Sequence, residues 1–305
     1  MPIPAVFEHM VERAGIKLVG SREIYPALHQ PGDAGQSMLV VKNALGRAII
    51  GLQGAQVMSF QPSGAQEMLW VSPKCVLEPG KAVRGGIPLC IPWFGPGQEG
   101  AMLHGFGRIM EWSLVAVEIC CDGATRLALE LAGDALVCKV WPYAFRFRLE
   151  VTVGTTLTLA LSADNRSTAD APFAFAFHTY FAVPNVSDVL VTGLMRTTFI
   201  DKLDNMTRKV QQGDIAIQAP TERVYLDVPA EQLLKIPTGD VKIKSDAKCA
   251  VVWNAYTNDR NLPDLGEGNH VGYICVERGD VADHAVRIQG GDRYQVSMSL
   301  SSVSK

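Results

Sequence analysis

The stretch FRFRLEVTVGTTLTLALSA, residues 145–163, has the alternation of a two-stranded β-hairpin. Apolar residues stand at the odd positions of 145–153 and mostly charged ones at the even positions, so one face of an extended chain is apolar. The tripeptide GTT at 154–156 provides a turn, and the leucines at 157, 159 and 161 continue the alternation. We therefore predict an antiparallel hairpin that buries one face.

Strand-like runs recur along the whole chain, whereas helical periodicity is confined to residues 5–14 and a turn in PAEQLLK, 229–235. This balance predicts an all-β fold, a large antiparallel β-sandwich with few short helices. No repeat or linker divides the chain, so we predict one domain over residues 1–305. The other predicted strands are SMLVVKN (37–43), RAIIGL (47–52), AQVMSFQ (55–61), TRLALEL (125–131), DVLVTGL (188–194), CAVVWN (249–254) and DRYQVSMSL (292–300).

Composition excludes several classes of function. The 305 residues are 48% hydrophobic and 19% charged, enough to bury a large core. A formal net charge of −3 provides no field for nonspecific binding to nucleic acid or an anionic membrane. No stretch approaches the roughly 18 apolar residues of a membrane span, and charges interrupt the N-terminal segment. We expect partners to be small molecules and the chain to be a monomer.

The cysteines and the missing motifs bear on cofactors. Seven scattered cysteines, an odd number without a C-x-x-C pair, are typical of reduced thiols in a cytoplasmic protein, not of a disulfide framework or a zinc site. The sequence also lacks G-x-x-x-x-G-K-[ST], G-x-S-x-G and H-E-x-x-H. We therefore expect neither a cofactor nor a metal.

A histidine interrupts an apolar run in FAFAFHTYFAV, residues 173–183. If the run is one strand, its phenylalanines point one way, whereas Ala174, Ala176, His178 and Tyr180 point the other way. The two alanines leave space beside His178 for a concave pocket. The alternative is a core histidine bonded to a backbone carbonyl.

A carboxylate interrupts a second apolar run, GYICVERG, residues 272–279. Alternation puts Tyr273, Cys275 and Glu277 on one face of this strand. Burying a carboxylate is costly unless it is paired or functional. The alternative is that Glu277 ends the strand and reaches water or an arginine such as Arg278.

Two loops carry arginines next to glycines. Arg84 precedes Gly85 and Gly86, where backbone can approach a ligand closely, and Arg108 ends LHGFGR, residues 103–108. Two guanidinium groups on neighbouring loops are suited to clamping a phosphate or carboxylate. The alternative is two surface ion pairs.

Taken in order, these motifs resemble the aldose 1-epimerase (galactose mutarotase-like) superfamily, and within it the glucose-6-phosphate 1-epimerase branch, the hexose-6-phosphate mutarotases. The resemblance begins near residue 38 and leaves residues 1–37 as an N-terminal extension. The motifs that carry it are GAQVMSF (54–60), EMLWVS (67–72), RGGIPLCIPWFG (84–95), HGFGR (104–108), FHTYF (177–181) and ICVE (274–277).

The resemblance implies a β-sandwich with the sugar across one sheet, His178 as acid and Glu277 as base. It also implies that His104 and Asp264, the latter in NLPDLGEG (261–268), line the pocket, and that Arg84 and Arg108 lie near a sugar phosphate. The substrate it implies is a hexose 6-phosphate. The phenylalanine before His178 suits this branch, since galactose mutarotases usually carry asparagine there.

Two positions depart from the branch. Glu222 stands in ERVYLDV (222–228) where an aspartate is common, and Arg278 follows the base where a small or neutral residue is more usual. The first concerns a secondary pocket contact and the second concerns the environment of the base. Neither removes the acid or the base.

Anomer interconversion accounts for these residue types without a cofactor. A base removes the proton of the C1 hydroxyl, an acid protonates the ring oxygen, and the ring opens and closes on its other face. Proximity predicts an ionised Glu277 and a protonated His178, because each charge favours the other. Three alternatives remain open: a mutarotase for unphosphorylated aldoses, a catalytically silent carbohydrate-binding protein, and a structural or regulatory partner protein.

Overall fold

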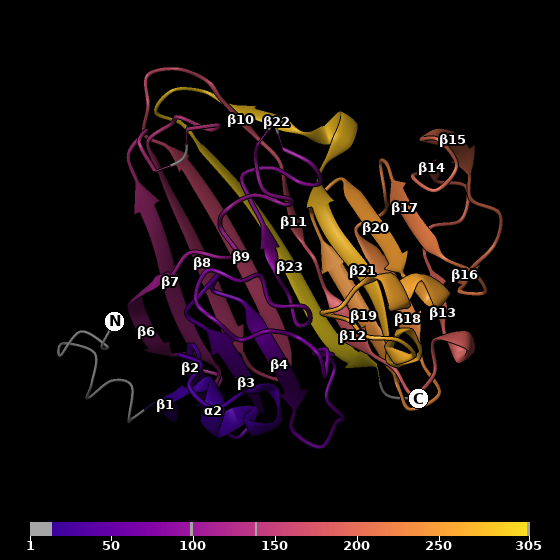
Figure 1. Ribbon diagram of the computed structural model, residues 1–305, viewed down its shortest axis with the longest axis horizontal. Helices are drawn as coiled ribbons and strands as arrows, with labels where there is room; N and C mark the ends of the chain where they lie inside the picture. The colour runs from indigo at the N-terminus through magenta and orange to yellow at the C-terminus, as the bar shows by residue number, and fades with distance from the viewer. Residues whose placement is uncertain (1–13, 98–99, 138, 304–305) are drawn as a thin grey trace.

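The computed structural model describes residues 14–97, 100–137 and 139–303. In these residues the strands form sheets of nine, eight, four and two strands, and neighbouring strands are antiparallel throughout. The predicted all-β sandwich is confirmed. Figure 1 shows the long strands β7, β8, β9 and β23 side by side, with β17, β20 and β21 beside them.

The nine-stranded sheet contains the predicted hairpin. The hairpin is β8 paired with β9 in a register that runs from Phe145 opposite Asn165 to Val153 opposite Leu157. The odd positions of β8 are buried and the even ones only partly so, as the alternation predicts. In spatial order this sheet consists of β16 (Ile215–Ala216), β13 (Leu190–Thr192), β18 (Glu231–Lys235), β19 (Asp240–Ser245), β23 (Arg293–Val303), β9 (Thr156–Asn165), β8 (Phe145–Val153), β7 (Thr125–Gly133) and β6 (Ser113–Ile119).

The eight-stranded sheet packs one face on the nine-stranded sheet, with Leu149, Phe177 and Val276 in the same buried cluster. Its other face carries a second apolar cluster that includes Ala176 and Val251. In spatial order it consists of β15 (Thr207–Val210), β14 (Thr198–Asp201), β17 (Thr221–Tyr225), β20 (Cys249–Asn254), β21 (Tyr273–Asp280), β11 (Phe175–Phe177) and β5 (Leu89–Cys90), and β12 (Tyr180–Ala182) also pairs with β21.

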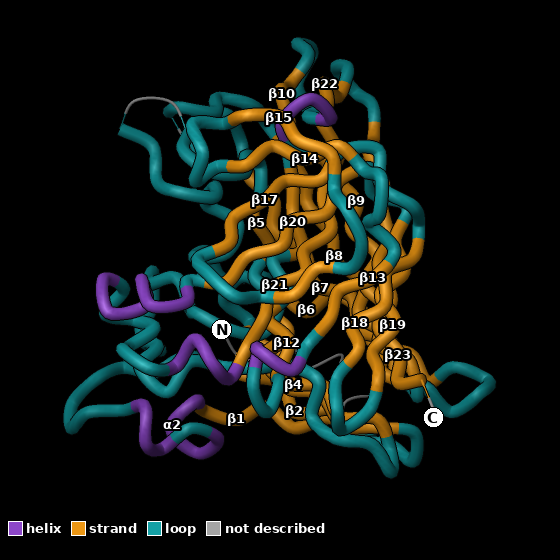
Figure 2. The backbone as a smooth tube through the Cα atoms, turned by 90° about the vertical axis from the view of Figure 1, so that its right-hand side faces the viewer, coloured by secondary structure: helices purple, strands orange, loops and turns teal. Residues whose placement is uncertain are grey.

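The remaining elements are smaller. Figure 2 shows the helical turns at the periphery of the strands. No helix formed by the described residues has the length and apolar character needed to cross a bilayer. These elements are the sheet of β1 (Ile16–Gly20), β2 (Ser37–Lys42), β3 (Gly46–Gly51) and β4 (Val57–Pro62), the pair β10 (Ala171–Phe173) and β22 (Val286–Ile288), the helix α2 (Ser21–Ile24), and the 3-10 turns η1 (Pro26–Leu28), η2 (Val186–Asp188), η3 (Tyr256–Asn261), η4 (Asn269–Gly272) and η5 (Ala282–His284).

The seven further predicted strands are confirmed as β2, β3, β4, β7, β13, β20 and β23. The predicted helical turn at 229–235 is wrong: most of it is β18, where Gln232 and Leu234 are buried with period two because β13 and β19 pair with it. The single strand predicted at 173–183 is also wrong, since it is divided into β10, β11 and β12. The predicted helix at 5–14 lies, apart from residue 14, outside the described residues.

Candidate active site

His178 and Glu277 meet on the face of the eight-stranded sheet that is turned away from the main core. Glu277 lies within β21, and His178 directly follows β11, whose Phe177 is paired with Arg278 of β21. This register brings His178 Nε2 to 3.4 Å from Glu277 Oε1. The two side chains are 11% and 1% exposed. The structure thus joins the two residues that the sequence analysis singled out as acid and base.

Each member of this pair keeps one polar atom without a hydrogen bond. In the described residues, His178 Nδ1 and Glu277 Oε2 are buried and have no partner. The histidine ring therefore has no hydrogen bond to the carbonyl oxygen of another described residue, as an ordinary core histidine would have. Glu277 lies inside β21 and does not end it. Arg278 projects from the opposite face of the strand, so it is not the partner of Glu277. Unsatisfied buried polar atoms are costly, which is a mark of a functional site.

Burial determines the protonation of the pair. It lowers the pKa of His178 well below 6.5, and the charges of Arg108 and Arg84 lower it further. Burial also raises the pKa of Glu277 well above 4.5. Mutual attraction would favour the ion pair, but desolvation outweighs it for both groups. Burial therefore favours the neutral form of each group, in the direction opposite to the ionised Glu277 and protonated His178 that proximity alone predicts.

Arg84 borders the same pocket and already has partners. Its Nε lies 2.8 Å from Asp264 Oδ2, its NH1 donates to the Tyr180 hydroxyl at 3.2 Å, and its guanidinium carbon lies 5.8 Å from the ring centre of Trp253. Burial lowers the pKa of Arg84, but Tyr180 and Asp264 outweigh this effect, so the pKa rises. Arg84 is thus a permanent cation with a preset orientation, and Asp264 contacts it from outside the pocket lining.

A left-handed turn places His104 in the pocket. His104 has φ 64° and Gly105 has φ 71°, and a Cβ on Gly105 would lie 1.9 Å from the carbonyl oxygen of Ile91, so only glycine fits. The His104 ring lies 5.6 Å from that of His178, and its Nδ1 accepts from the backbone N–H of Gly95. Burial lowers the pKa of His104 to about 3, so it is neutral and its Nε2 is a hydrogen-bond donor.

Arg108 lies behind this turn, outside the pocket lining. Its NH2 donates to the carbonyl oxygen of Leu103 at 2.7 Å, and its buried Nε has no hydrogen-bond partner in the described residues. Its charge nevertheless lowers the pKa of both His104 and His178. Of the two arginines, Arg108 is the one whose charge no described carboxylate neutralises within ion-pair distance.

The double glycine after Arg84 serves the fold, and this corrects the expectation that it admits a ligand. A Cβ on Gly85 would lie 2.5 Å from Val71 Cα, and one on Gly86 would lie 2.2 Å from the Val57 carbonyl oxygen. The close approach is therefore between backbone segments. It fixes the segment from which Arg84 reaches the pocket.

The pocket has a volume of about 170 Å³, and an adjoining hollow of about 370 Å³ shares Glu222, Trp253 and Leu262 with it. Trp253, which lines both hollows, and Lys202, which borders them through Glu222, are not among the residues predicted from the sequence. The Lys202 ammonium group pairs with Glu222, and its charge acts on Glu277 and His104. The pocket is lined by Arg84, Phe94, Leu103, His104, His178, Glu222, Val251, Trp253, Leu262 and Glu277.

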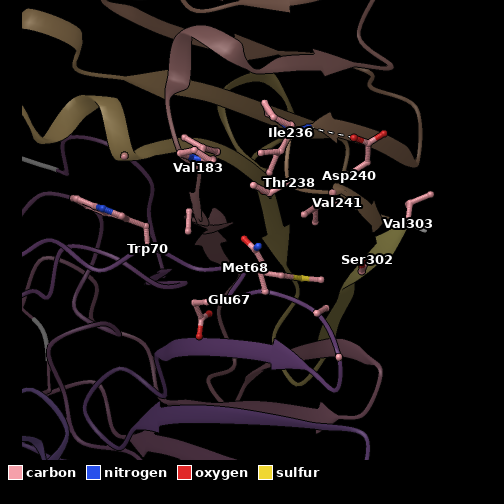
Figure 3. A pocket seen from close by; sticks show the side chains of 18 residues that line it. Glu67, Met68, Trp70, Val183, Ile236, Thr238, Asp240, Val241, Ser302 and Val303 are labelled. Atoms are coloured by element: carbon pink, nitrogen blue, oxygen red, sulfur yellow. Dashed lines mark hydrogen bonds between the residues drawn. The ribbon is translucent and has the colours of Figure 1, made fainter. Parts of the chain in front are cut away.

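A larger cleft of about 770 Å³ lies elsewhere, between the loop after β4, the turn joining β18 to β19, and the end of β23. Figure 3 shows Glu67, Trp70 and Asp240 among its walls. The Glu67 carboxylate accepts bonds from Ser59, Phe60 and Leu69, and Asp240 accepts one from the Ile236 amide. Its acidic groups are thus bound to the protein's own donors, so this cleft lacks the free acid and base of the smaller pocket.

No group of three or more His, Cys, Asp or Glu side chains among the described residues is arranged to hold a metal ion. The cysteines near the pocket are also unsuited to chemistry as thiolates. Burial raises the pKa of Cys275 well above 9.0, and burial also raises that of Cys90. The groups in this pocket that can exchange a proton are His178 and Glu277, and they lie beside the positive charge of Arg84.

Comparison with known proteins gives consistent matches. The model of the family described as "Aldose 1-epimerase" matches residues 37–301. The chain is 34% identical to a protein of Cenchrus ciliaris, over 84% of this chain and 81% of that protein. It is 35% identical to a protein of Salmonella typhimurium, over 79% and 82% respectively. Both are named "Putative glucose-6-phosphate 1-epimerase".

A solved structure from Salmonella typhimurium, described as a "putative mutarotase", is similar with a TM-score of 0.83 and 27% identity, covering 98% of this chain and 100% of that one. A Lactobacillus acidophilus structure described as a "galactose mutarotase related enzyme" has a TM-score of 0.69 at 17% identity. This second likeness concerns the fold alone. It covers 88% of this chain and 97% of that one.

Proposed function

The chain belongs to the aldose 1-epimerase family, and we propose that it interconverts the α and β anomers of glucose 6-phosphate or a related hexose 6-phosphate. The observation that carries this proposal is the buried His178–Glu277 pair, with 3.4 Å between Nε2 and Oε1, in a pocket bordered by Arg84. The relatives' names support the phosphorylated substrate. The reaction is an isomerisation and consumes nothing.

The pair supplies one proton acceptor and one proton donor, as ring opening requires. The base takes the proton of the C1 hydroxyl, the C1–ring oxygen bond breaks, and the acid protonates the ring oxygen. The aldehyde then turns about the C1–C2 bond and the steps run in reverse on its other face. We assign the base to Glu277 and the acid to His178, and hydrogen bonding to the sugar to His104.

Burial favours the neutral form of each group, which places the required proton on Glu277 instead of His178. A neutral pair and an ion pair hold the same number of protons, so one transfer from Glu277 to His178 sets the assigned roles. A phosphate dianion near Arg84 and Arg108 offsets the positive charges that lower the pKa of His178. Binding of the phosphate thus favours the protonated histidine and prepares the site for reaction.

A second candidate is a mutarotase for unphosphorylated aldoses. It is favoured by one observation, the ion pair between Arg84 and Asp264, which already neutralises one of the two arginines proposed to hold the phosphate. For either substrate we propose a monomer acting in the cytoplasm. The compartment is supported by the seven scattered cysteines.

Exchange-resolved NMR of the anomeric protons tests the proposed function. We expect the purified protein to accelerate exchange between the anomers of glucose 6-phosphate far above the buffer rate, and to accelerate it less for glucose and galactose. Faster exchange of the free sugars would support the second candidate. Sugar binding without accelerated exchange of any of them would make the protein a carbohydrate-binding module.

We predict a bell-shaped dependence of kcat/KM on pH. Below the lowered pKa of His178 the pair gains a second proton and loses its base, so the acid limb lies below pH 6.5. Above the raised pKa of Glu277 the pair loses its only proton and its acid. The profile is measured with glucose as well, because its reacting form has no phosphate that titrates in this range. An acid limb centred above pH 6.5 with both sugars would contradict the prediction.

A further inference from the structure

A second buried charge follows Glu277 directly in β21. Arg278 is 0% exposed and shares the face of Val276, which packs in the main core between the two large sheets. Its NH1 donates to the Gln232 side-chain oxygen, and its NH2 donates to the carbonyl oxygen of Ala247 at 2.6 Å. Longer bonds reach the carbonyl oxygens of Pro229, Ala230 and Ser245.

These acceptors connect the two halves of the sandwich. Gln232 lies in β18 and Ser245 ends β19, both in the nine-stranded sheet, whereas Arg278 lies in β21 of the eight-stranded sheet. Gln232 is itself held, since its amide donates to the Pro229 carbonyl oxygen at 2.7 Å. The guanidinium therefore ties the central strand of the site to the opposite sheet through fixed partners.

The strand register places the hydrogen-bonded Arg278 next to both His178 and Glu277. Arg278 is paired with Phe177 on β11 and with Ala250 on β20. His178 follows Phe177, and Glu277 precedes Arg278, so each lies one residue from the tied pair. A shift of the backbone at Arg278 changes the separation of His178 and Glu277 directly.

Stability alone does not account for an arginine here. No carboxylate of the described residues lies within ion-pair distance of the guanidinium; Glu277 points to the opposite face, and Asp280 binds the Lys248 amide and the Tyr294 hydroxyl. Burial lowers the pKa of Arg278 to about 10, so it is still charged at neutral pH. A buried charge without a counter-ion is costly, and the hydrogen bonds to these acceptors must offset that cost.

We propose that Arg278 is a positioning residue for the acid–base pair: it locks β21 to β18 and to the segment after β19, and so holds Glu277 beside His178, with 3.4 Å between Oε1 and Nε2. The proposal rests on the proposed function of the pair. It fits the lack of a hydrogen bond on Glu277 Oε2, because the carboxyl group has no anchor of its own and depends on its backbone for its position.

Three variants test this role: Arg278→Met, Arg278→Lys and the matched control Arg148→Met. Arg148 is a part-buried arginine of β8, paired with Glu130 and Glu150, remote from the pocket lining. We expect Arg278→Met to lower kcat about 10-fold or more, the scale of a small misplacement of reacting groups, with KM within about twofold. Arg278→Lys keeps the charge but satisfies fewer acceptors, so its kcat should lie between methionine and wild type.

A second readout does not depend on activity. The imidazole resonances of His178, followed by NMR against pH, report its contact with Glu277. We expect its titration to shift in Arg278→Lys, where the charge is retained, and not in Arg148→Met. Where Arg278→Met does not fold, Gln232→Met removes an acceptor and leaves the arginine, and it should shift kcat and the titration in the same direction.

The outcomes test the positioning role of Arg278 separately from the proposed function. Wild-type kcat and an unchanged His178 titration in Arg278→Lys and Gln232→Met, with only a lower melting temperature, would make Arg278 structural and overturn the proposal. Absence of anomer exchange in the wild-type protein would overturn the proposed function. In that case the His178 titration alone decides whether Arg278 positions the pair.

Discussion

Replacing Glu277 by glutamine should lower kcat for anomer exchange by about 100-fold or more, the usual scale for a positioned acid or base. Glutamine keeps the shape of the side chain but cannot accept or store the proton that the pair shares. His178→Asn should lower kcat to a similar degree. Because the two side chains act as a unit, the double variant should lose little more than either single variant. Exchange NMR at saturating glucose 6-phosphate measures all three.

Thermal unfolding is the control for these variants, because it shows that each one folds. The change in stability with pH also has a predicted direction. Burial raises the pKa of folded Glu277, so between about pH 4.5 and that raised pKa the folded chain holds a proton that the unfolded chain releases. Wild-type stability therefore falls as pH rises through this range, whereas glutamine does not titrate. Relative to wild type, Glu277→Gln should become more stable as the pH rises from about 4.5 toward that raised pKa. Near-wild-type kcat in a folded variant would remove that residue from the mechanism.

The sequence predicts strands well where one face is solvated. In β8 and β9 successive residues alternate between buried and partly exposed positions, so the sequence alternates between apolar and polar residues and predicts the strand. It fails at residues 173–183, where nearly every position is buried. There the strand is interrupted at Thr179, whose amide bonds to the carbonyl oxygen of Phe177, while the amides of His178 and Tyr180 bond to the carbonyl oxygens of Pro88 and Gly86.

The sequence predicts which residue types form the site, but it does not predict their protonation. His178 and Glu277 stand out as polar groups in apolar runs, whereas Lys202 lies in an ordinary turn and reaches the site only through its pairing with Glu222. The protonation of the pair depends on how far each group is removed from water. Proximity in a motif gives only the attraction, so the sequence predicts an ion pair, whereas burial shifts both pKa values toward the neutral forms.

Arg108→Met should raise KM for glucose 6-phosphate about 10- to 100-fold, the loss of a charge-assisted contact to phosphate worth roughly 1.5–3 kcal/mol. Arg108 is expected to matter more than Arg84, because Arg84 already has Asp264 as a counter-ion. KM for free glucose should change much less. The matched control is Arg126→Met, an exposed arginine of β7 paired with Glu118.

The effects of Arg108→Met on KM for glucose 6-phosphate and on kcat for free glucose together show whether the phosphate only binds or also activates the site. A phosphate that only anchors the sugar makes Arg108→Met a KM variant with wild-type kcat. A phosphate that also favours the protonated form of His178 gives a different result. Removing Arg108 takes away one of the charges that lower the pKa of His178, so the variant should process free glucose with a higher kcat than wild type does. Equal increases in KM for both sugars would instead make Arg108 a structural support of the Leu103 loop.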